Sequence, residues 1–93
     1  MPVVAEFSVT PLVEGEMKPF VDAAVDEVKR SGLKYEVDAM GTTVEGDLDE
    51  VLDTVKRAHN AVRQKGARRF FTEVRIDEKE EGTTIDEELE DYR

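Results

Sequence analysis

The stretch Met40-Gly-Thr-Thr-Val-Glu-Gly-Asp-Leu-Asp-Glu-Val51 decides the fold, because it joins a strand to a helix near the middle of the chain. Thr42 to Glu45 include β-branched residues on both faces, which favours a short strand, and Gly46 ends that strand. Asp47 and Glu50 have the spacing of a capping box directly before an apolar helical pattern. The stretch therefore predicts a turn at Gly41, a strand over 42–45 and a helix over 47–65.

The segments on either side of this stretch repeat one another. Residues 3–10, 34–40 and 68–77 alternate apolar and polar side chains, as half-buried strands do. Residues 17–31 and 47–65 have apolar side chains at helical spacing, and Gly32 and Gly66 are suited to end these helices. The order β-α-β-β-α-β predicts an α+β, ferredoxin-like two-layer sandwich: a four-stranded antiparallel sheet with two helices on one face. A different α+β two-layer order is the alternative.

The charge is distributed unevenly along the chain. Of the net charge of −10, residues 77–93 contribute −7, from nine acids against Lys79 and Arg93. We therefore expect a ferredoxin-like domain over residues 1–79 and an acidic C-terminal tail over 80–93 that is solvated and partly disordered. Such a tail repels phosphate and anionic lipid, so neither nucleic acid nor membrane is an expected partner. The start of the chain shows no secretory signal, which predicts a cytoplasmic protein.

Few residues suggest catalysis. The chain has no cysteine, which removes thiolate metal sites and cysteine nucleophiles, and no phosphate-binding loop is present. Its one histidine, His59, lies on the apolar stripe of the second helix, where a core or boundary role is more common than catalysis. We expect no catalytic residue, no metal site and no cofactor. An enzyme using Glu36, Asp38 or His59 is the least favoured possibility.

The sheet face opposite the helices is left open, and the alternation of the strands gives its occupants. Carboxylates dominate this face, hydroxyl groups lie among them, and Arg75 is its one base. Three interpretations remain open: a solvated face, a subunit interface, or a small-molecule site on or beside the face. RNA binding is disfavoured, because it requires several exposed aromatic residues surrounded by lysine or arginine side chains. The predicted residues are Val4, Glu6, Ser8, Thr10, Glu36, Asp38, Met40, Thr43, Glu45, Phe71, Glu73 and Arg75.

Four blocks of sequence resemble the small YkoF-like thiamine-binding proteins. The blocks are Glu6–Leu12, Ser31–Glu36, Met40–Gly46, and Gly66–Arg69 leading to Val74–Asp77. The likeness covers residues 3–79, and the Met-Gly-Thr…Glu-Gly segment is its most specific part. The acidic tail beyond residue 80 lies outside it.

The resemblance implies a ferredoxin-like subunit that assembles into a homotetramer, a dimer of dimers. It also implies that the protein binds thiamine or its hydroxymethylpyrimidine part without catalysis. Motif matching carries over Ser8, Thr10, Met40, Thr42 and Glu45 as ligand-binding candidates. Each of these residues also has a purely structural interpretation as part of a strand, an interface or a turn. The alternative function is a homo-oligomeric protein-interaction module with an acidic tail and no small-molecule ligand.

Overall fold

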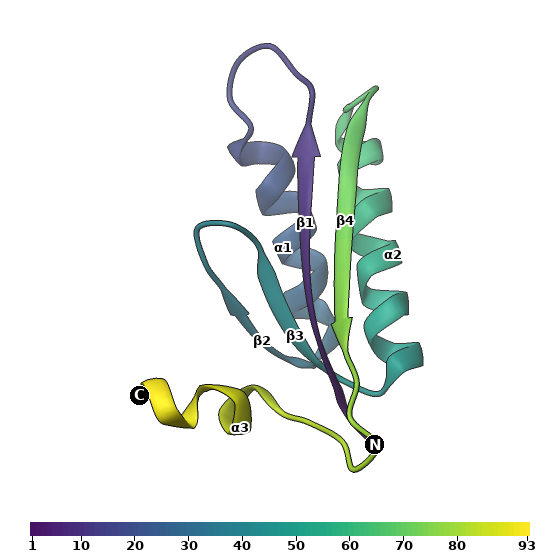
Figure 1. Ribbon diagram of the computed structural model, residues 1–93. Coiled ribbons are helices and arrows are strands. Elements are labelled where there is room, and N and C mark those ends of the chain that lie inside the picture. Colours follow the sequence, from purple (N-terminus) through teal and green to yellow (C-terminus); the bar gives the residue numbers. More distant parts are fainter.

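The computed structural model describes all residues from 1 to 93, and Figure 1 shows the arrangement of its elements. The elements occur in the order β-α-β-β-α-β, followed by two short helical segments at the C-terminus. Their bounds are β1 Val3–Pro11, α1 Lys18–Ser31, β2 Lys34–Val37, β3 Thr42–Gly46, α2 Leu48–Lys65, β4 Phe70–Asp77, α3 Ile85–Leu89 and a 3₁₀ turn, Glu90–Tyr92. None of the helices combines the length and apolar character that crossing a lipid bilayer requires.

The four strands form one antiparallel sheet in the order β2-β3-β1-β4. Both long helices lie behind the sheet in Figure 1, so one face is covered and the other is left open. This is the ferredoxin-like arrangement that the sequence predicts, and the expected fold class is confirmed.

The core forms between the sheet and the two helices because apolar residues alternate along the central strand β1. Ala5, Phe7 and Val9 point toward the helices and are buried, whereas Glu6 and Thr10 are exposed on the open face. Apolar side chains of α1 and α2 pack against them at helical spacing. The buried cluster consists of Val3, Ala5, Phe7, Val9, Ala24, Val28, Val44, Val51, Val55, Ala58, Val62 and Ala67.

The helix ends follow the predicted signals. Asp47 and Glu50 form a capping box at the start of α2, in which the Asp47 N–H donates to Glu50 Oε1 at 3.3 Å. Gly32 and Gly66 follow α1 and α2 with φ of 75° and 119°. Only glycine adopts this left-handed backbone without strain, so the two stops set where each helix ends.

All four strands differ from the prediction at one end: β3 includes Gly46 and β4 begins at Phe70 instead of residue 68, and the other two differences have a visible cause. The second strand ends at Val37 instead of extending to residue 40, because the Asp38 carboxylate accepts hydrogen bonds from the N–H groups of Met40 and Gly41, at 2.8 and 3.0 Å. These bonds curl residues 38–41 into the hairpin turn. The first strand includes Pro11, and its pairing with the last strand continues to the Leu12 N–H, which donates to the Arg69 carbonyl at 2.9 Å.

The C-terminal segment, residues 80–93, departs from the expectation of a solvated, partly disordered tail. Thr83 and Ile85 are 0% and 2% exposed, and the Thr83 N–H donates to the Pro2 carbonyl at 3.0 Å. The Ile85 N–H donates to Glu45 Oε1 at 2.9 Å. Negative charge did not prevent docking, because a few uncharged residues within the acidic segment bind at the end of the sheet. The division at residue 79 between a domain and a tail stays a prediction.

Candidate functional site

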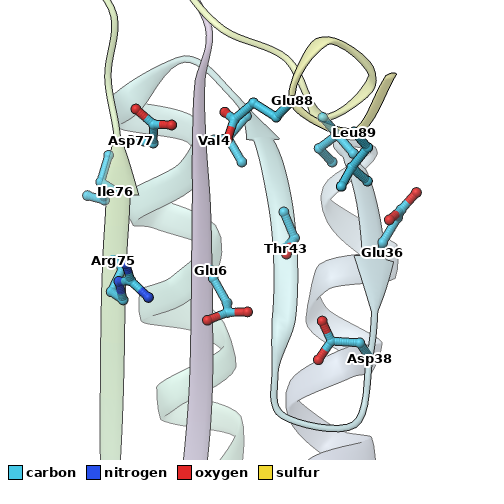
Figure 2. Close-up of a pocket in the computed structure, with 11 residues that line it drawn as sticks. Val4, Glu6, Glu36, Asp38, Thr43, Arg75, Ile76, Asp77, Glu88 and Leu89 are labelled. Atoms are coloured by element: carbon cyan, nitrogen blue, oxygen red, sulfur yellow. The ribbon is translucent and has the colours of Figure 1, made fainter. Parts of the chain in front are cut away.

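Two neighbouring hollows share Glu6, Asp38 and Arg75 in their linings. The first, of about 400 Å³, lies between the sheet face and the C-terminal segment. Glu6 from β1 and Thr43 from β3 point into it from the sheet, with Glu88 and Leu89 of the C-terminal segment at one end (Figure 2). We call it the sheet-face hollow; its lining is Val4, Glu6, Glu36, Asp38, Thr43, Arg75, Ile76, Asp77, Ile85, Glu88 and Leu89.

The second hollow, of about 550 Å³, lies where β1 extends beyond the end of β3. The pairing of these strands stops at Phe7 and Thr42, so one edge of β1 is free from Ser8 onward. The β2–β3 hairpin tip around Met40 and residues of α1 line the other side of this space. We call it the edge hollow; its volume lies within the range of about 300–1,000 Å³ that is usual for small-ligand sites.

The free edge of β1 presents backbone hydrogen-bonding groups to the edge hollow. In an antiparallel pair, alternate residues direct their N–H and C=O groups toward the same neighbour. Because Leu12 bonds to Arg69 on the β4 side, the register directs the backbone groups of Thr10 and Ser8 toward β4 as well. The groups of Val9 point the other way, toward the free edge. Val9 therefore offers one donor and one acceptor, side by side, to the hollow.

Four of the five predicted ligand residues line the edge hollow. Ser8 and Thr10 lie on the open face of β1, and Met40 lies at the hairpin tip with 82% of its surface exposed. Thr42 also lines this hollow, but from the helix side, since it pairs with the core residue Phe7 and is 5% exposed.

Glu45, the fifth candidate, is not brought together with the other four. It lies toward the opposite end of β3, where its carboxylate accepts the hydrogen bond from Ile85. Thr43 and Glu45 lie on the open face, as the sequence predicts, whereas Thr42 lies on the face toward the helices.

Carboxylates outnumber basic side chains in the lining of both hollows. Glu6 and Asp38 line both, and Arg75 is the only base in the lining of either one. Glu73 adds a further carboxylate to the edge hollow. This surplus of negative charge favours a cationic ligand, while the hydroxyl groups of Ser8, Thr10 and Thr42 can hydrogen-bond to a polar ring.

An ion-pair network holds the C-terminal segment beside the sheet-face hollow. Asp86 accepts from Lys34 Nζ at 2.5 Å and from Arg93 at 2.9 Å, and Arg93 also pairs with Glu36 of β2. The hydrogen bond from Lys34, followed by that from Arg93, holds the pKa of the Asp86 carboxyl below its usual value. The network therefore joins the last residues of the chain to the edge strand β2.

Sequence reasoning missed the part of the sheet-face hollow that the C-terminal segment provides. Ile85, Glu88 and Leu89 line it, although residues 80–93 were expected to be solvated. A signal was present: Thr84 caps a short helix by accepting from the Glu87 N–H at 3.1 Å, and Ile85 and Leu89 have the i, i+4 spacing of an apolar helix face.

His59 has a structural position, as the sequence predicts. Its Nδ1 lies 2.7 Å from Thr72 Oγ1, and its ring packs against Phe70 with centroids 4.5 Å apart. These contacts join α2 to β4 on the helix side of the sheet, and His59 lines neither hollow.

Fold and site together define a small two-layer α+β domain with acidic, hydroxyl-bearing hollows beside its open sheet face. A family model described as thiamine-binding protein matches residues 5–93, so the chain belongs to this family, and the resemblance stated from the sequence is confirmed. The match includes residues 80–93, which lie outside the four blocks of sequence that carry the resemblance.

Relatives of known sequence and structure agree with this assignment. UPF0045 proteins of Methanocaldococcus jannaschii and Methanothermobacter thermautotrophicus are 42% and 40% identical; the alignments cover 94% and 83% of this chain, and 88% and 81% of the relatives. A domain of unknown function from Bacillus cereus superposes with a TM-score of 0.94 at 42% identity, covering 100% of this chain and 91% of that one. A Thermotoga maritima protein provisionally described as a thiamine biosynthesis/salvage protein gives 0.93 at 37% identity, with 100% of both chains covered.

Proposed function

We propose that this chain binds thiamine or its hydroxymethylpyrimidine part without converting it, and that it does so as a homo-oligomer, a dimer of dimers. The observation that carries the proposal is the edge hollow, where four residues selected by family resemblance, from β1, the hairpin tip and β3, line one space. The family model and the name of the Thermotoga maritima relative support thiamine as the ligand class.

The chemistry of the hollow fits the two halves of thiamine. The thiazolium ring carries a permanent positive charge, which the carboxylates of Glu6, Asp38 and Glu73 complement. The aminopyrimidine ring carries a donor next to an acceptor, which matches the N–H and C=O pair that Val9 directs to the free edge. Glu45 stays in the proposal as the residue that holds the C-terminal segment, through its bond to Ile85.

The non-catalytic part of the proposal rests on the family description and on the residues of the hollow. His59, the most versatile acid–base residue of the chain, is engaged with Thr72 on the other side of the sheet. Thiamine incubated with the protein should therefore be recovered unchanged when it is analysed by chromatography.

The position of the ligand can be tested with a pair of neighbouring threonines. Thr42 lines the edge hollow and Thr43 the sheet-face hollow, and in each a change to valine removes the hydroxyl group but keeps the branched shape. We expect Thr42→Val to weaken thiamine binding about three- to tenfold, the effect of one lost hydrogen bond, and Thr43→Val to leave it unchanged. Isothermal titration calorimetry measures both. The opposite order would move the ligand to the sheet-face hollow, and no heat from folded wild-type protein at millimolar thiamine would refute the function.

The role of charge is tested by comparing thiamine with the neutral hydroxymethylpyrimidine. Glu6→Gln removes a carboxylate that lines both hollows, so it should weaken thiamine binding about threefold or more and change pyrimidine binding little. Glu45→Gln is the matched control, because its carboxylate lies toward the other end of β3. Equal losses for both ligands in Glu6→Gln would show that this carboxylate does not face the thiazolium.

A further inference from the structure

Residues 54–72, from the middle of α2 to the start of β4, carry a positive charge that the rest of the chain lacks. This stretch holds six bases and no acid, a net of +6 within a chain of net −10. The other seven of the 13 bases stand among all 23 acids, a net of −16. In Figure 1 the loop between α2 and β4 lies at the end of the molecule opposite to the acidic C-terminal segment. The charge of the molecule is therefore strongly uneven.

Three of the six bases have a partner within the chain. Arg57 pairs with Asp53 one helical turn earlier on α2. Lys65 lines a hollow together with carboxylates of α1. The guanidinium of Arg69 lies 5.8 Å from the centroid of the Phe71 ring, within the range of a cation–π contact.

The other three bases, Lys56, Arg63 and Arg68, are exposed and form no ion pair. Lys56 and Arg63 are seven residues apart, so they lie on one face of α2, about 10 Å from each other along the helix axis. The Gly66 N–H donates to the Arg63 carbonyl at 3.0 Å, and this turn keeps Arg68 near the end of the same helix. We call Lys56, Arg63 and Arg68 the basic patch.

Local structure accounts for only one member of the basic patch. Arg63 lies in the last turn of α2, where a cation interacts favourably with the helix dipole. Lys56 lies more than two turns before the helix end and Arg68 follows the stop at Gly66, so neither gains from a dipole that acts within the last turn. Like charges gathered on one surface repel one another. A local arrangement that costs stability is expected mainly at functional surfaces.

The shape of the basic patch favours a macromolecule over a small ligand. Small molecules bind in concave sites, and none of the three hollows of the chain is lined by Lys56, Arg63 or Arg68. Guanidinium groups on an open surface can still bind carboxylates or phosphates strongly, because each can form two parallel hydrogen bonds.

The limited extent of the patch favours a short acidic peptide over a nucleic acid. From Lys56 to the end of α2 is about 14 Å, which four or five extended residues span. Asp49 and Asp53 precede the patch on α2 and bound it with negative charge. A nucleic acid duplex carries about one charge per 1.7 Å along its whole length, so it would continue over these carboxylates. A short segment avoids them.

We propose that the basic patch docks a short acidic segment of another protein, whose carboxylates pair with the ammonium and guanidinium groups along α2. The patch shares no residue with either hollow of the candidate site. The inference therefore does not depend on whether thiamine is the ligand.

The probe for this surface is a fluorescein-labelled peptide of about ten residues in which glutamate alternates with glycine, long enough to cover the patch. Its control is the same peptide with glutamine in place of glutamate. Fluorescence anisotropy with the full-length protein at low salt gives both dissociation constants. We expect the glutamate peptide to bind at least about tenfold more tightly, and to bind more weakly as salt screens the exposed charges.

Charge reversals in the protein locate the contact. Arg63→Glu and Arg68→Glu should each weaken binding of the glutamate peptide about fivefold or more. Lys29→Glu is the matched control, because it makes the same change of net charge at an exposed position in the last turn of α1 and should change binding less than about twofold. Arg68 lies outside α2, so its variant tests the contact without altering the helix, and far-UV circular dichroism checks the fold of each variant.

Three results would overturn the inference. The first is an unchanged anisotropy of the glutamate peptide at about 1 mM protein and low salt. The second is an equal loss of binding in Lys29→Glu and Arg68→Glu, which would show that net charge alone matters. The third is a DNA duplex of about twenty base pairs, or a vesicle containing phosphatidylserine, that binds more tightly than the peptide and is released by the same reversals. That result would assign the patch to a phosphate-bearing partner.

Discussion

Gly41 shows how a single residue shapes the candidate site. A Cβ atom built at this position would lie 2.8 Å from the Phe7 carbonyl oxygen, a distance that such atoms do not tolerate. The absence of a side chain thus lets the hairpin tip approach β1 at the point where the edge hollow begins.

We expect Gly41→Ala to destabilise the protein by about 1–3 kcal/mol, because the backbone of β1 cannot move away without disturbing the sheet. Urea unfolding followed by circular dichroism measures the free energy. Met40→Ala, at the exposed neighbouring position, should change it by less than about 0.5 kcal/mol. Equal stability of Gly41→Ala and wild type would show that the hairpin tip can move away freely.

The sheet face of a residue was predictable where it depends only on the alternation along its strand. It was not predictable where it depends on another segment of the chain. The alternation of β1 placed Ser8 and Thr10 on the open face because a strand has a fixed period of two. Thr42 was undecided because its face depends on where the hairpin turn ends, and the Asp38 carboxylate determines that. The bond between Glu45 and Ile85 joins residues far apart in sequence, so no local pattern could reveal it.

At the scale of elements, the C-terminal segment has two kinds of attachment. Thr83 and Ile85 are buried, whereas the ion pairs of Asp86 and Arg93 lie in solvent. The buried residues should therefore hold the segment to the sheet, and the exposed ion pairs should set how often its end detaches.

Acid should loosen the end of this segment. The pKa of Asp86 is lower in the folded chain than its unfolded value of about 3.9, so its contribution is fully present above about pH 4 and is lost as the pH falls through the lower, folded value. Amide hydrogen exchange of residues 86–92 should consequently accelerate below about pH 4 relative to the intrinsic rate.

Asp86→Asn should show the faster exchange already at neutral pH and should lose most of the acid dependence. Glu87→Gln is the matched control, since this neighbouring carboxylate forms no ion pair. Identical pH profiles for Asp86→Asn and the wild type would exclude Asp86 as the residue that responds to acid.

At the scale of the whole molecule, the fold could be predicted because every local signal agreed with one topology. Two helix stops, a capping box, three alternating segments and the β-branched stretch at 42–45 fix six elements, and short right-handed connections leave one common arrangement. The docking of the acidic segment could not be predicted from composition, because a few residues such as Ile85 determine it against the average charge.

The hydrogen bond between Thr83 and Pro2 joins the start of the chain to the segment that follows β4, and β1 lies between β3 and the late strand β4. A chain under synthesis folds from its N-terminal part, so β4 and Thr83 leave the ribosome last. Until they do, a strand that is central in the finished sheet has one edge without a partner, and such edges promote aggregation. A polypeptide terminated before β4 should consequently be an aggregation-prone fragment that quality control must remove, rather than a smaller stable domain.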